Sequence, residues 1–337
     1  MSVTHFRSVM SPPVYTDEIN KLPDEIIMEI FKYLPPCSID ACELVCQRWS
    51  KLASDPSVWR NIAFVYSGKP QVQKEHAYNM KIIETKSEKV HCLKVQYVEK
   101  FQHVYRIISM CRNIISLELT MCTIDHLFEN ITELKNLRKL SLKNSILRRS
   151  DASDVTVQFD TLKYLQYLEL SEFGLNANNC DSLMRCKYLC NIKIRKVKGL
   201  TLEYIKNLIN CKKEILKTFQ VYGDDAIDNK CLQLLSECPA LEDLAIVRCE
   251  RLTDEGFAHL AAFKNLLHLQ IWNNANFTER CLTETLDSAN LVKLIMLSFS
   301  KIANISPSTV DVISEKYTRL KFLALYQCPK IVGVDYE

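Results

Sequence analysis

LEDLAIVRCERLTDEGFAHLA, found at residues 241–261, sets the architecture of this chain of 337 residues. It opens with Leu241, Leu244 and Ile246 in the pattern apolar-x-x-apolar-x-apolar. Alternate side chains of a β-strand share a face, so the pattern predicts a short strand with these residues turned inward. The apolar residues within 256–260 predict a helix that returns along the outside. Neither element can bury its apolar side alone, so the unit must stack on similar neighbours.

Copies of the same pattern recur along most of the chain, 23 to 29 residues apart. This spacing lies in the range of about 20–29 residues that is typical of leucine-rich repeats. The sequence therefore predicts an α/β fold over 90–337, namely a curved solenoid with a parallel concave sheet and outer helices. The ten copies begin at residues 90, 114, 137, 165, 189, 216, 241, 266, 291 and 320.

Some copies carry a further signal after the strand pattern. A cysteine stands eight residues after the first apolar position in three of them, as Cys122, Cys249 and Cys328, and Asn274 occupies this position once. These copies resemble the cysteine-containing subclass of leucine-rich repeats.

The repeat register also predicts which side chains face the concave side, namely the third, fifth and seventh of each copy. In the late copies several of these are large and apolar, and such residues are typical anchors of protein interfaces. The alternative is that a C-terminal segment covers this surface. The copy at 291, LVKLIMLSF, can also slip by one residue, which would exchange its two faces. The expected substrate-binding floor consists of Tyr222, Trp272, Leu297, Phe322 and Tyr326.

Basic residues occupy the same register positions in the earlier copies. Lys139, Lys143, Lys193 and Arg195 would form a basic shoulder that steers an acidic or phosphorylated segment. The alternative is that these side chains are merely solvated. The short basic run at 193–198 is narrower than the usual footprint on a phosphate backbone, so no nucleic-acid partner is expected.

A second informative stretch is INKLPDEIIMEIFKYLPPCSIDACELVCQRWSKLASDPSVWRNI at residues 19–62. Pro23 suits the first position of a helix, Ser38 suits the cap of a second, and Asp55-Pro56 suits the start of a third. So short a segment rarely buries enough surface to stand alone, and this one is rich in large apolar side chains. It therefore predicts a three-helix docking module whose core is completed by a partner protein.

The apolar residues of this stretch follow an ordered motif that resembles the F-box. The motif runs Leu-Pro, Ile, Ile-Phe-x-x-Leu, Val-Cys-x-x-Trp and Trp-Arg, and the resemblance implies binding to the Skp adaptor of a cullin–RING ubiquitin ligase. The alternative is an ordinary helical subdomain packed on the rest of the chain. The adaptor contacts that the resemblance implies are Leu22, Pro23, Ile26, Ile30, Phe31, Leu34, Val45, Cys46, Trp49 and Trp59.

An F-box followed by leucine-rich repeats implies the substrate receptor of a Skp–cullin–F-box ubiquitin ligase. Its partners would be the Skp adaptor, through it the cullin and RING subunits, and a protein substrate that is ubiquitinated and degraded by the proteasome. The alternative is a scaffold that binds the adaptor without turnover of a target. The sequence has no Gly-rich phosphate loop, Gly-x-Ser-x-Gly elbow or His-Glu-x-x-His helix, so we expect a non-catalytic subunit without a cofactor.

Composition limits the remaining choices. The formal net charge is only +3, and no run of about 18 apolar residues occurs, so no membrane segment is expected. Fifteen cysteines without a Cys-x-x-Cys pair indicate buried, reduced thiols and no metal site, which favours a cytoplasmic or nuclear protein. Residues 1–18 are expected to form a flexible tail, and residues 63–89 a connecting segment.

Overall fold

The computed structural model describes residues 18–69, 73–124, 131, 133–145, 158–223, 227–274 and 276–331. The chain divides into two compact units, Met1–Ile62 and Ala63–Glu337. Apart from Glu18, the tail expected at 1–18 lies outside the described residues.

The first unit is helical, but its second expected helix is in fact two. The break falls at Glu43–Val45, and the next helix starts after Cys46, whose Sγ accepts a hydrogen bond from the Trp49 amide at 3.5 Å. The earlier of the two helices begins at Pro36 and not at a Ser38 cap, because a proline has no amide to satisfy in a first turn. The elements are η1 (Ile19–Lys21), α1 (Asp24–Phe31), α2 (Pro36–Cys42), α3 (Gln47–Ala53) and α4 (Pro56–Trp59).

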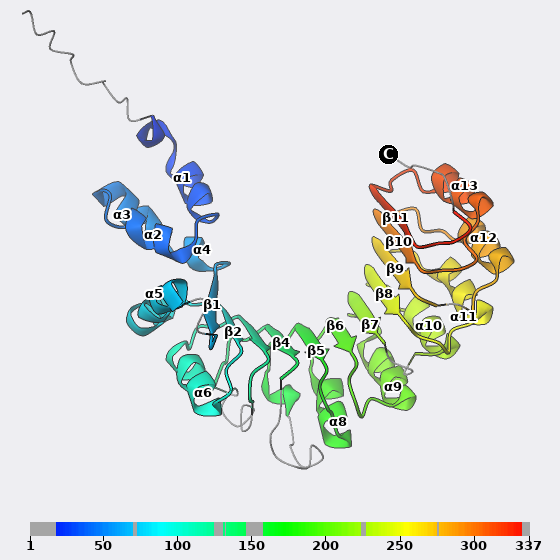
Figure 1. Cartoon of the computed structure of the whole chain (residues 1–337), viewed down its shortest axis with the longest axis horizontal. Helices are drawn as coiled ribbons and strands as arrows, with labels where there is room; N and C mark the ends of the chain where they lie inside the picture. Colours follow the sequence, from blue (N-terminus) through cyan, green and yellow to red (C-terminus); the bar gives the residue numbers. More distant parts are fainter. Residues whose placement is uncertain are drawn as a thin grey trace, which may run out of the picture. The chain divides into compact units, whose positions relative to one another are not determined.

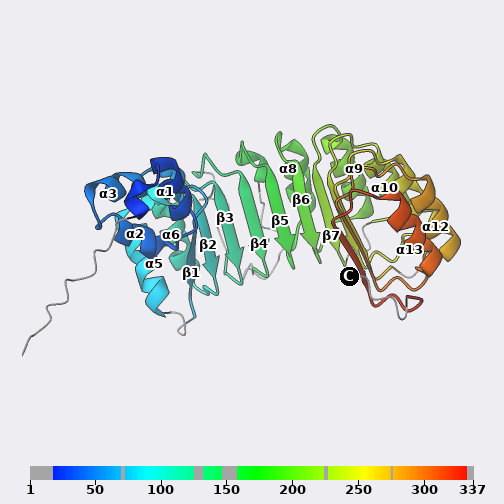
Figure 2. The same ribbon diagram turned by 90° about the horizontal axis from the view of Figure 1, so that it is seen from above.

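The second unit is a solenoid built on one parallel sheet, which has eleven strands in chain order within the described residues. In Figure 1 its strands line the inner side of a curve and its helices the outer side, and Figure 2 shows successive strands side by side. The strands are β1 (Ala63–Ser67), β2 (Cys92–Gln96), β3 (Ser116–Thr120), β4 (Lys139–Lys143), β5 (Tyr167–Ser171), β6 (Asn191–Arg195), β7 (Thr218–Tyr222), β8 (Asp243–Val247), β9 (His268–Trp272), β10 (Met296–Ser300) and β11 (Phe322–Tyr326).

Four of the eight outer helices that the structure describes begin at a side chain that accepts a hydrogen bond from the first turn. Asn176, Thr201, Asp228 and Thr278 each cap a helix in this way. The helices are α5 (Gln73–Thr85), α6 (Phe101–Met110), α8 (Ala177–Arg185), α9 (Leu202–Lys212), α10 (Asn229–Ser236), α11 (Asp254–Ala258), α12 (Glu279–Ser288) and α13 (Pro307–Lys316), with the 3-10 turns η3 (Ser87–Lys89), η4 (Phe159–Thr161) and η5 (His259–Ala262).

The sheet starts earlier than the repeat pattern predicted. Residues 63–89 were expected to connect the two parts, but Ala63–Ser67 form β1, which pairs with β2 along its whole length. The sequence AFVYS lacks the leucines of the later copies, yet Phe64 takes the buried inward position opposite Leu93. An aromatic residue can therefore replace the leucine at the end of the array.

The core lies behind the sheet, where the inward positions of successive strands stack. The first, fourth and sixth pattern residues are buried in all copies but the last, as Leu137, Leu140 and Leu142 illustrate. A further buried residue stands three positions before each copy from the third onward, with one exception in the copy at 216. These residues are Leu134, Leu162, Cys186, Cys238, Phe263, Leu291 and Tyr317.

This additional buried position explains one error in the predicted register. Leu291 is the preceding core residue and not the first residue of its copy, so the copy begins at Leu294. The shift of three residues exchanges the two faces. Leu297 pairs with Leu269 and is fully buried, so it does not belong to the concave floor to which the sequence analysis assigned it.

Every strand from β2 to β11 is followed by one residue with a left-handed backbone. Nine of these residues are not glycine, with φ from 47° at Asn144 to 60° at Arg248, and the tenth is Gly223 with φ 75°. Left-handed backbone costs roughly 1–2 kcal/mol for a residue with a Cβ, so the turn into each outer segment is imposed by the packing of the repeat.

The close approach at Gly199 gives a test of how tightly these turns pack. Gly199 has φ 85°, and a Cβ there would overlap the carbonyl oxygen of Leu175, next to the backbone bridge between Gly174 and Lys198. We expect Gly199→Ala to lower the free energy of unfolding by at least about 3 kcal/mol, through left-handed strain together with displacement of this bridge. Urea unfolding of the purified chain measures the effect.

Gly223→Ala is the matched control. It has nearly the same φ, but the nearest atom to its Cβ is Lys196 Cγ at 3.8 Å, an ordinary contact. The control should lose only about 1–2 kcal/mol. Equal losses for the two variants would show that the Leu175 contact adds nothing.

Candidate functional site

The first unit presents apolar side chains that its own core does not use. On α1, Ile27 and Phe31 are buried, while Ile26 and Ile30 point outward with 48% and 39% of their surface exposed. Residues four apart share one face of a helix, so the two pairs define an inner and an outer face of α1. Val45, in the turn before α3, is exposed as well. Three of the predicted adaptor contacts are thus available at the surface.

Two of the other predicted contacts are not available. Phe31 packs edge-on against Trp49, with ring centroids 5.3 Å apart, and only 2% of its surface is exposed. Trp59 is fully buried, and its indole nitrogen donates a hydrogen bond to the Ala53 carbonyl at 2.6 Å. In this structure both are core residues, because a large aromatic ring is what so small a helical unit can bury most effectively.

The remaining predicted contacts are partly accessible. Leu22, Leu34 and Trp49 are half-buried, and Pro23 and Cys46 are exposed. The structure also shows exposed apolar residues that the motif did not single out, namely Ile19, Tyr33 and Leu44. Leu44 stands directly before Val45 in the turn between α2 and α3, and 87% of its surface is exposed. This exposure could not be predicted from the sequence.

Arg48 is a further residue that the sequence analysis missed. Its guanidinium contacts the Asp24 carboxylate at 2.6 and 2.8 Å and donates to the Leu22 carbonyl at 2.6 Å. The neighbouring Trp49 indole donates to Asn20 Oδ1 at 3.1 Å. Through these contacts α3 holds the segment that leads into α1, so Arg48 sets the position of the Leu22-Pro23 pair.

The concave face of the second unit consists of three rows of side chains, because equal strand positions are paired across the whole sheet. At the late strands one row carries Tyr222, Val247, Trp272 and Tyr326. Trp272 is 37% exposed, with its indole nitrogen donating to Ser298 Oγ at 2.9 Å, and Tyr326 is 64% exposed.

The other residues of the predicted floor differ in how exposed they are. Phe322, in the first row of β11, is exposed, and Tyr222 is half-buried. Since Leu297 faces inward, β10 contributes Ser298 and Ser300 to the concave side instead. The aromatic floor is therefore interrupted by a polar strand between Trp272 and the residues of β11.

The predicted basic shoulder is partly neutralised. Lys143 lies 3.3 Å from both Glu118 and Glu169, and the Lys139 ammonium lies 4.5 Å from the centre of the Tyr167 ring. These partners could not be predicted from the sequence, because each of them comes from a neighbouring repeat.

Glu169 lies at the centre of this network. It accepts hydrogen bonds from Ser141 Oγ at 2.9 Å and from Tyr167 Oη at 3.2 Å, and it pairs with Lys143. Burial alone would raise the pKa of Glu169, but the Ser141 hydrogen bond and Lys143 outweigh it, with a smaller contribution from Lys193, and the pKa is lowered. The carboxylate is therefore charged at neutral pH and already supplied with donors.

A small hollow of about 230 Å³ opens beside this network on the concave face. It is lined by Glu169, Lys193, Arg195 and Tyr222, with Leu170 and Ile194 behind them. Tyr222 is held by a hydrogen bond from its hydroxyl to Gln220 Oε1 at 3.0 Å, and the Gln220 amide donates to Asp243 at 2.8 Å. The structure thus brings together the two cations of β6 and one aromatic residue of the predicted floor.

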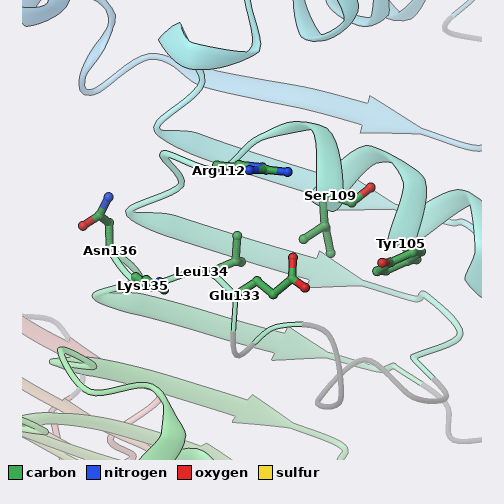
Figure 3. A pocket seen from close by; sticks show the side chains of 8 residues that line it. Tyr105, Ser109, Arg112, Glu133, Leu134, Lys135 and Asn136 are labelled. Carbon is green, nitrogen blue, oxygen red and sulfur yellow. The ribbon is translucent and has the colours of Figure 1, made fainter.

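A larger hollow of about 520 Å³ lies beside α6 and residues 133–136 (Figure 3). The side chains around it include Tyr105, Ser109, Arg112 and Glu133. Among the described residues that line it, none is a histidine or a cysteine and none belongs to a strand of the concave face.

Most of the thiols are packing residues, as expected, but Cys37, Cys46 and Cys211 are exposed. All fifteen cysteines are free, and burial raises the pKa of Cys111, Cys186 and Cys231 to about 12, so these thiols stay protonated at neutral pH. Across the described ranges, no group of three or more His, Cys, Asp or Glu side chains is placed to hold a metal ion. None of the helices in that part of the chain is both long and apolar enough to cross a bilayer.

Comparison with known proteins identifies the first unit. The family described as F-box-like matches residues 19–65. Over 46 residues the chain is 35% identical to F-box protein dre-1 of Caenorhabditis elegans, covering 14% of this chain and 5% of that protein. Over 53 residues it is 38% identical to F-box/LRR-repeat protein 12 of Homo sapiens, covering 15% of this chain and 16% of that protein. The chain carries an F-box-like domain, and the matches span only a small part of these curated relatives.

The whole chain has the fold of a solved solenoid. A chain in the crystal structure of the yeast Rad7 and Elc1 complex aligns with a TM-score of 0.52 and 14% identity, over 92% of this chain and 90% of that one. At this identity the likeness shows the fold alone. Together with the eleven-stranded parallel sheet, it confirms the predicted fold class, an F-box-like helical domain followed by a leucine-rich-repeat solenoid.

The position of Arg48 leads to a test of the first unit. Arg48→Ala removes a charged pair and a hydrogen bond to the Leu22 carbonyl, and we expect it to destabilise this unit by about 1–2 kcal/mol, since the pair is partly exposed. Two of the three tryptophans, Trp49 and Trp59, lie in this unit. Urea unfolding followed by tryptophan fluorescence in a Trp272→Phe background therefore reports on it selectively.

Lys51→Ala is the control for this experiment, because it removes an exposed cation from the same helix, α3. Its unfolding midpoint should stay near that of the parent protein. Coinciding curves for the Arg48 and Lys51 variants would mean that the guanidinium contacts do not hold the α1 entry.

Proposed function

We propose that this protein is the substrate-binding subunit of a Skp–cullin–F-box ubiquitin ligase. The observation that carries the proposal is the outer apolar face of the F-box-like domain, with Ile26 and Ile30 on α1 and Leu44 and Val45 in the turn before α3. A Skp-type adaptor would cover these side chains, and the concave face of the solenoid would hold a target protein.

The exposed apolar surface of the F-box-like domain favours the binding of a partner. Burial of apolar area contributes roughly 25 cal/mol per Å², so four large aliphatic side chains left at the surface of a small domain favour a partner. The resemblance to a chain of the Rad7–Elc1 complex supports this direction, because that solenoid was crystallised together with a second protein. The F-box-like match implies that the partner here is a Skp-type adaptor.

The subunit would act by proximity. Holding a target lysine close to a ubiquitin-charged conjugating enzyme raises its effective concentration, and no chemistry by this chain is needed. Cullin and RING subunits would join through the adaptor, and degradation of the target by the proteasome would follow. The free thiols support action in a reducing compartment, the cytoplasm or the nucleus.

The second candidate is a scaffold that binds the adaptor and a partner protein without ubiquitin transfer. The exposed apolar face of the F-box-like domain serves this role equally well. A reconstituted ubiquitination reaction separates the two, since only a receptor raises the rate at which its bound target is modified.

Adaptor binding is the first test of the proposal. Ile26→Asp places a charge on the outer face of α1, and a buried, unpaired charge should weaken binding to a purified Skp-type adaptor at least about tenfold. Isothermal titration calorimetry with the full chain measures the affinity. Val292→Asp is the matched control, because Val292 is an exposed aliphatic residue of the solenoid, with 52% exposure against 48% for Ile26. The proposal fails if the parent protein has no affinity for the adaptor.

Target binding is the second test. We expect the double variant Trp272→Ala and Tyr326→Ala to lose target proteins in affinity purification while it retains the adaptor, because aromatic anchors dominate interface energies. The control is Tyr164→Ala with Tyr188→Ala, an exposed stacked pair with centroids 6.2 Å apart that lies outside the strands. Unchanged recovery of targets by the first variant would reject the aromatic floor.

A further inference from the structure

We infer that the hollow at β6 and β7 is the anion subsite of a path for an extended peptide. Its ligand is a peptide with a phosphorylated serine or threonine held by Lys193 and Arg195, and with an apolar side chain about four residues away, held at Trp272. This rests on the proposed function, in which the concave face holds a target, and it names the chemical class of that target.

The two cations of β6 are available to a ligand. Unlike Lys143, neither Lys193 nor Arg195 forms an ion pair with any residue in the part of the chain that the structure describes. They stand two residues apart on one strand, so both side chains lie on the concave face, roughly 6–7 Å apart along it. Arg195 is exposed and Lys193 is half-buried.

The neighbouring polar groups form their hydrogen bonds and ion pairs with other residues, although the charge of Lys193 contributes to the lowered pKa of Glu169 beside it. On the β5 side, the Glu169 carboxylate is turned toward β4, where it accepts from Ser141 and pairs with Lys143. On the β7 side, Gln220 donates to Asp243 and accepts from the Tyr222 hydroxyl. The hollow is therefore lined by two cations that form no ion pair and by one carboxylate that is shared with Lys143, which leaves an excess of positive charge.

The size and chemistry of the hollow suit one anionic side chain. Its volume of about 230 Å³ is below the roughly 300–1,000 Å³ of sites that enclose a whole small molecule. A guanidinium can bind two phosphate oxygens at once, and an ammonium adds a compact charge. A phosphate monoester, with a charge of about −1.5 to −2, balances the charge of two cations better than a single carboxylate does.

The strand register indicates where the apolar side chain of the peptide would bind. Arg195 aligns with Tyr222 on β7, which aligns with Val247 on β8 and then with Trp272 on β9. Three strand steps of about 4.8 Å give roughly 14 Å, and an extended peptide covers this distance in about four residues. Figure 1 shows these four strands, β6 to β9, in succession. The path starts at two cations and ends at an exposed indole.

A peptide fits this surface better than a nucleic acid. The concave positions of β7 to β11 contain no lysine or arginine, and their one acidic residue is Asp243. A phosphate backbone needs positive charge repeated along its length. Here the positive charge is confined to one end, and an uncharged, partly aromatic row follows it.

The test uses the purified full chain and short fluorescent peptides whose binding is followed by anisotropy. The principal probe carries phosphoserine and phenylalanine about four residues apart, in both orders, in a background of glycine and alanine. We expect it to bind at least about tenfold more tightly than its unphosphorylated form and than a peptide in which the two residues are adjacent. Binding should weaken as salt is added.

Variants locate the site. Arg195→Ala should weaken the phosphopeptide about tenfold, since it removes charge-assisted hydrogen bonds. Lys198→Ala, which removes an exposed cation of the same basic run outside the strand, should leave the affinity unchanged. Glu169→Gln should tighten binding about threefold or more, because it removes a negative charge from the lining and keeps the side-chain shape.

Three results would overturn the inference: equal affinity for the phosphorylated and unphosphorylated peptides, equal losses from Arg195→Ala and Lys198→Ala, or equally tight binding of a single-stranded oligonucleotide. Inorganic phosphate that competes as strongly as the whole peptide would also overturn it, because the apolar end would then contribute nothing.

The same preparations separate this inference from the proposed function. Ile26→Asp should weaken adaptor binding and leave the peptide affinity intact, and Arg195→Ala should weaken peptide binding and leave the adaptor affinity intact. Loss of the peptide result alone rejects the anion subsite, whereas absence of adaptor binding with intact peptide binding rejects the receptor role.

Discussion

The in-register pairing of parallel strands is the constraint on which the solenoid depends. Leu244 on β8 is aligned with Phe219 on β7 and with Leu269 on β9, and the same alignment continues through the whole sheet. Because alternate residues face opposite sides, one alignment creates both the buried apolar stack behind the sheet and the three rows in front of it. The left-handed residue after each strand from β2 onward repeats with the same register. A concave side chain is therefore placed by its position in the repeat more than by its local neighbours.

The sequence was sufficient to predict the fold and most of this register. The wrong assignment of Leu297 to the concave face shows why part of the register could not be predicted. Most copies have buried apolar residues both at their first position and three positions earlier, as Leu291 and Leu294 illustrate. The spacing of three is the same between these residues as within the strand pattern, so the sequence alone offered two readings of LVKLIMLSF. Only pairing with β9 selects one of them. The strand at 63–67 was missed for a related reason, since Phe64 fills a leucine position without the leucine pattern.

In the F-box-like domain the motif mixed two kinds of residue that the sequence could not separate. Phe31 and Trp59 belong to the order of the motif as much as Ile26 and Ile30 do, but the first two complete the small core and the last two remain at the surface. An eight-residue helix with apolar residues on two sides buries one set in the domain core and leaves the other set exposed. No sequence pattern indicated the structural role of Arg48, because its partners, Asp24 and the Leu22 carbonyl, lie more than twenty residues away in the chain.

Charge on the concave face changes character at β6, and this change follows from which repeat supplies each carboxylate. Glu118 on β3 and Glu169 on β5 flank Lys143 on β4, so the cation is matched from both sides. β6 has a glutamate on one side only, and that glutamate is already turned toward β4, while β7 offers a neutral glutamine. The sequence located Lys193 and Arg195 on the correct face, but their isolation depends on contacts between neighbouring repeats. Because the uncharged row begins on the very next strand, a ligand that satisfies both features must combine an anion with an apolar group over a short distance.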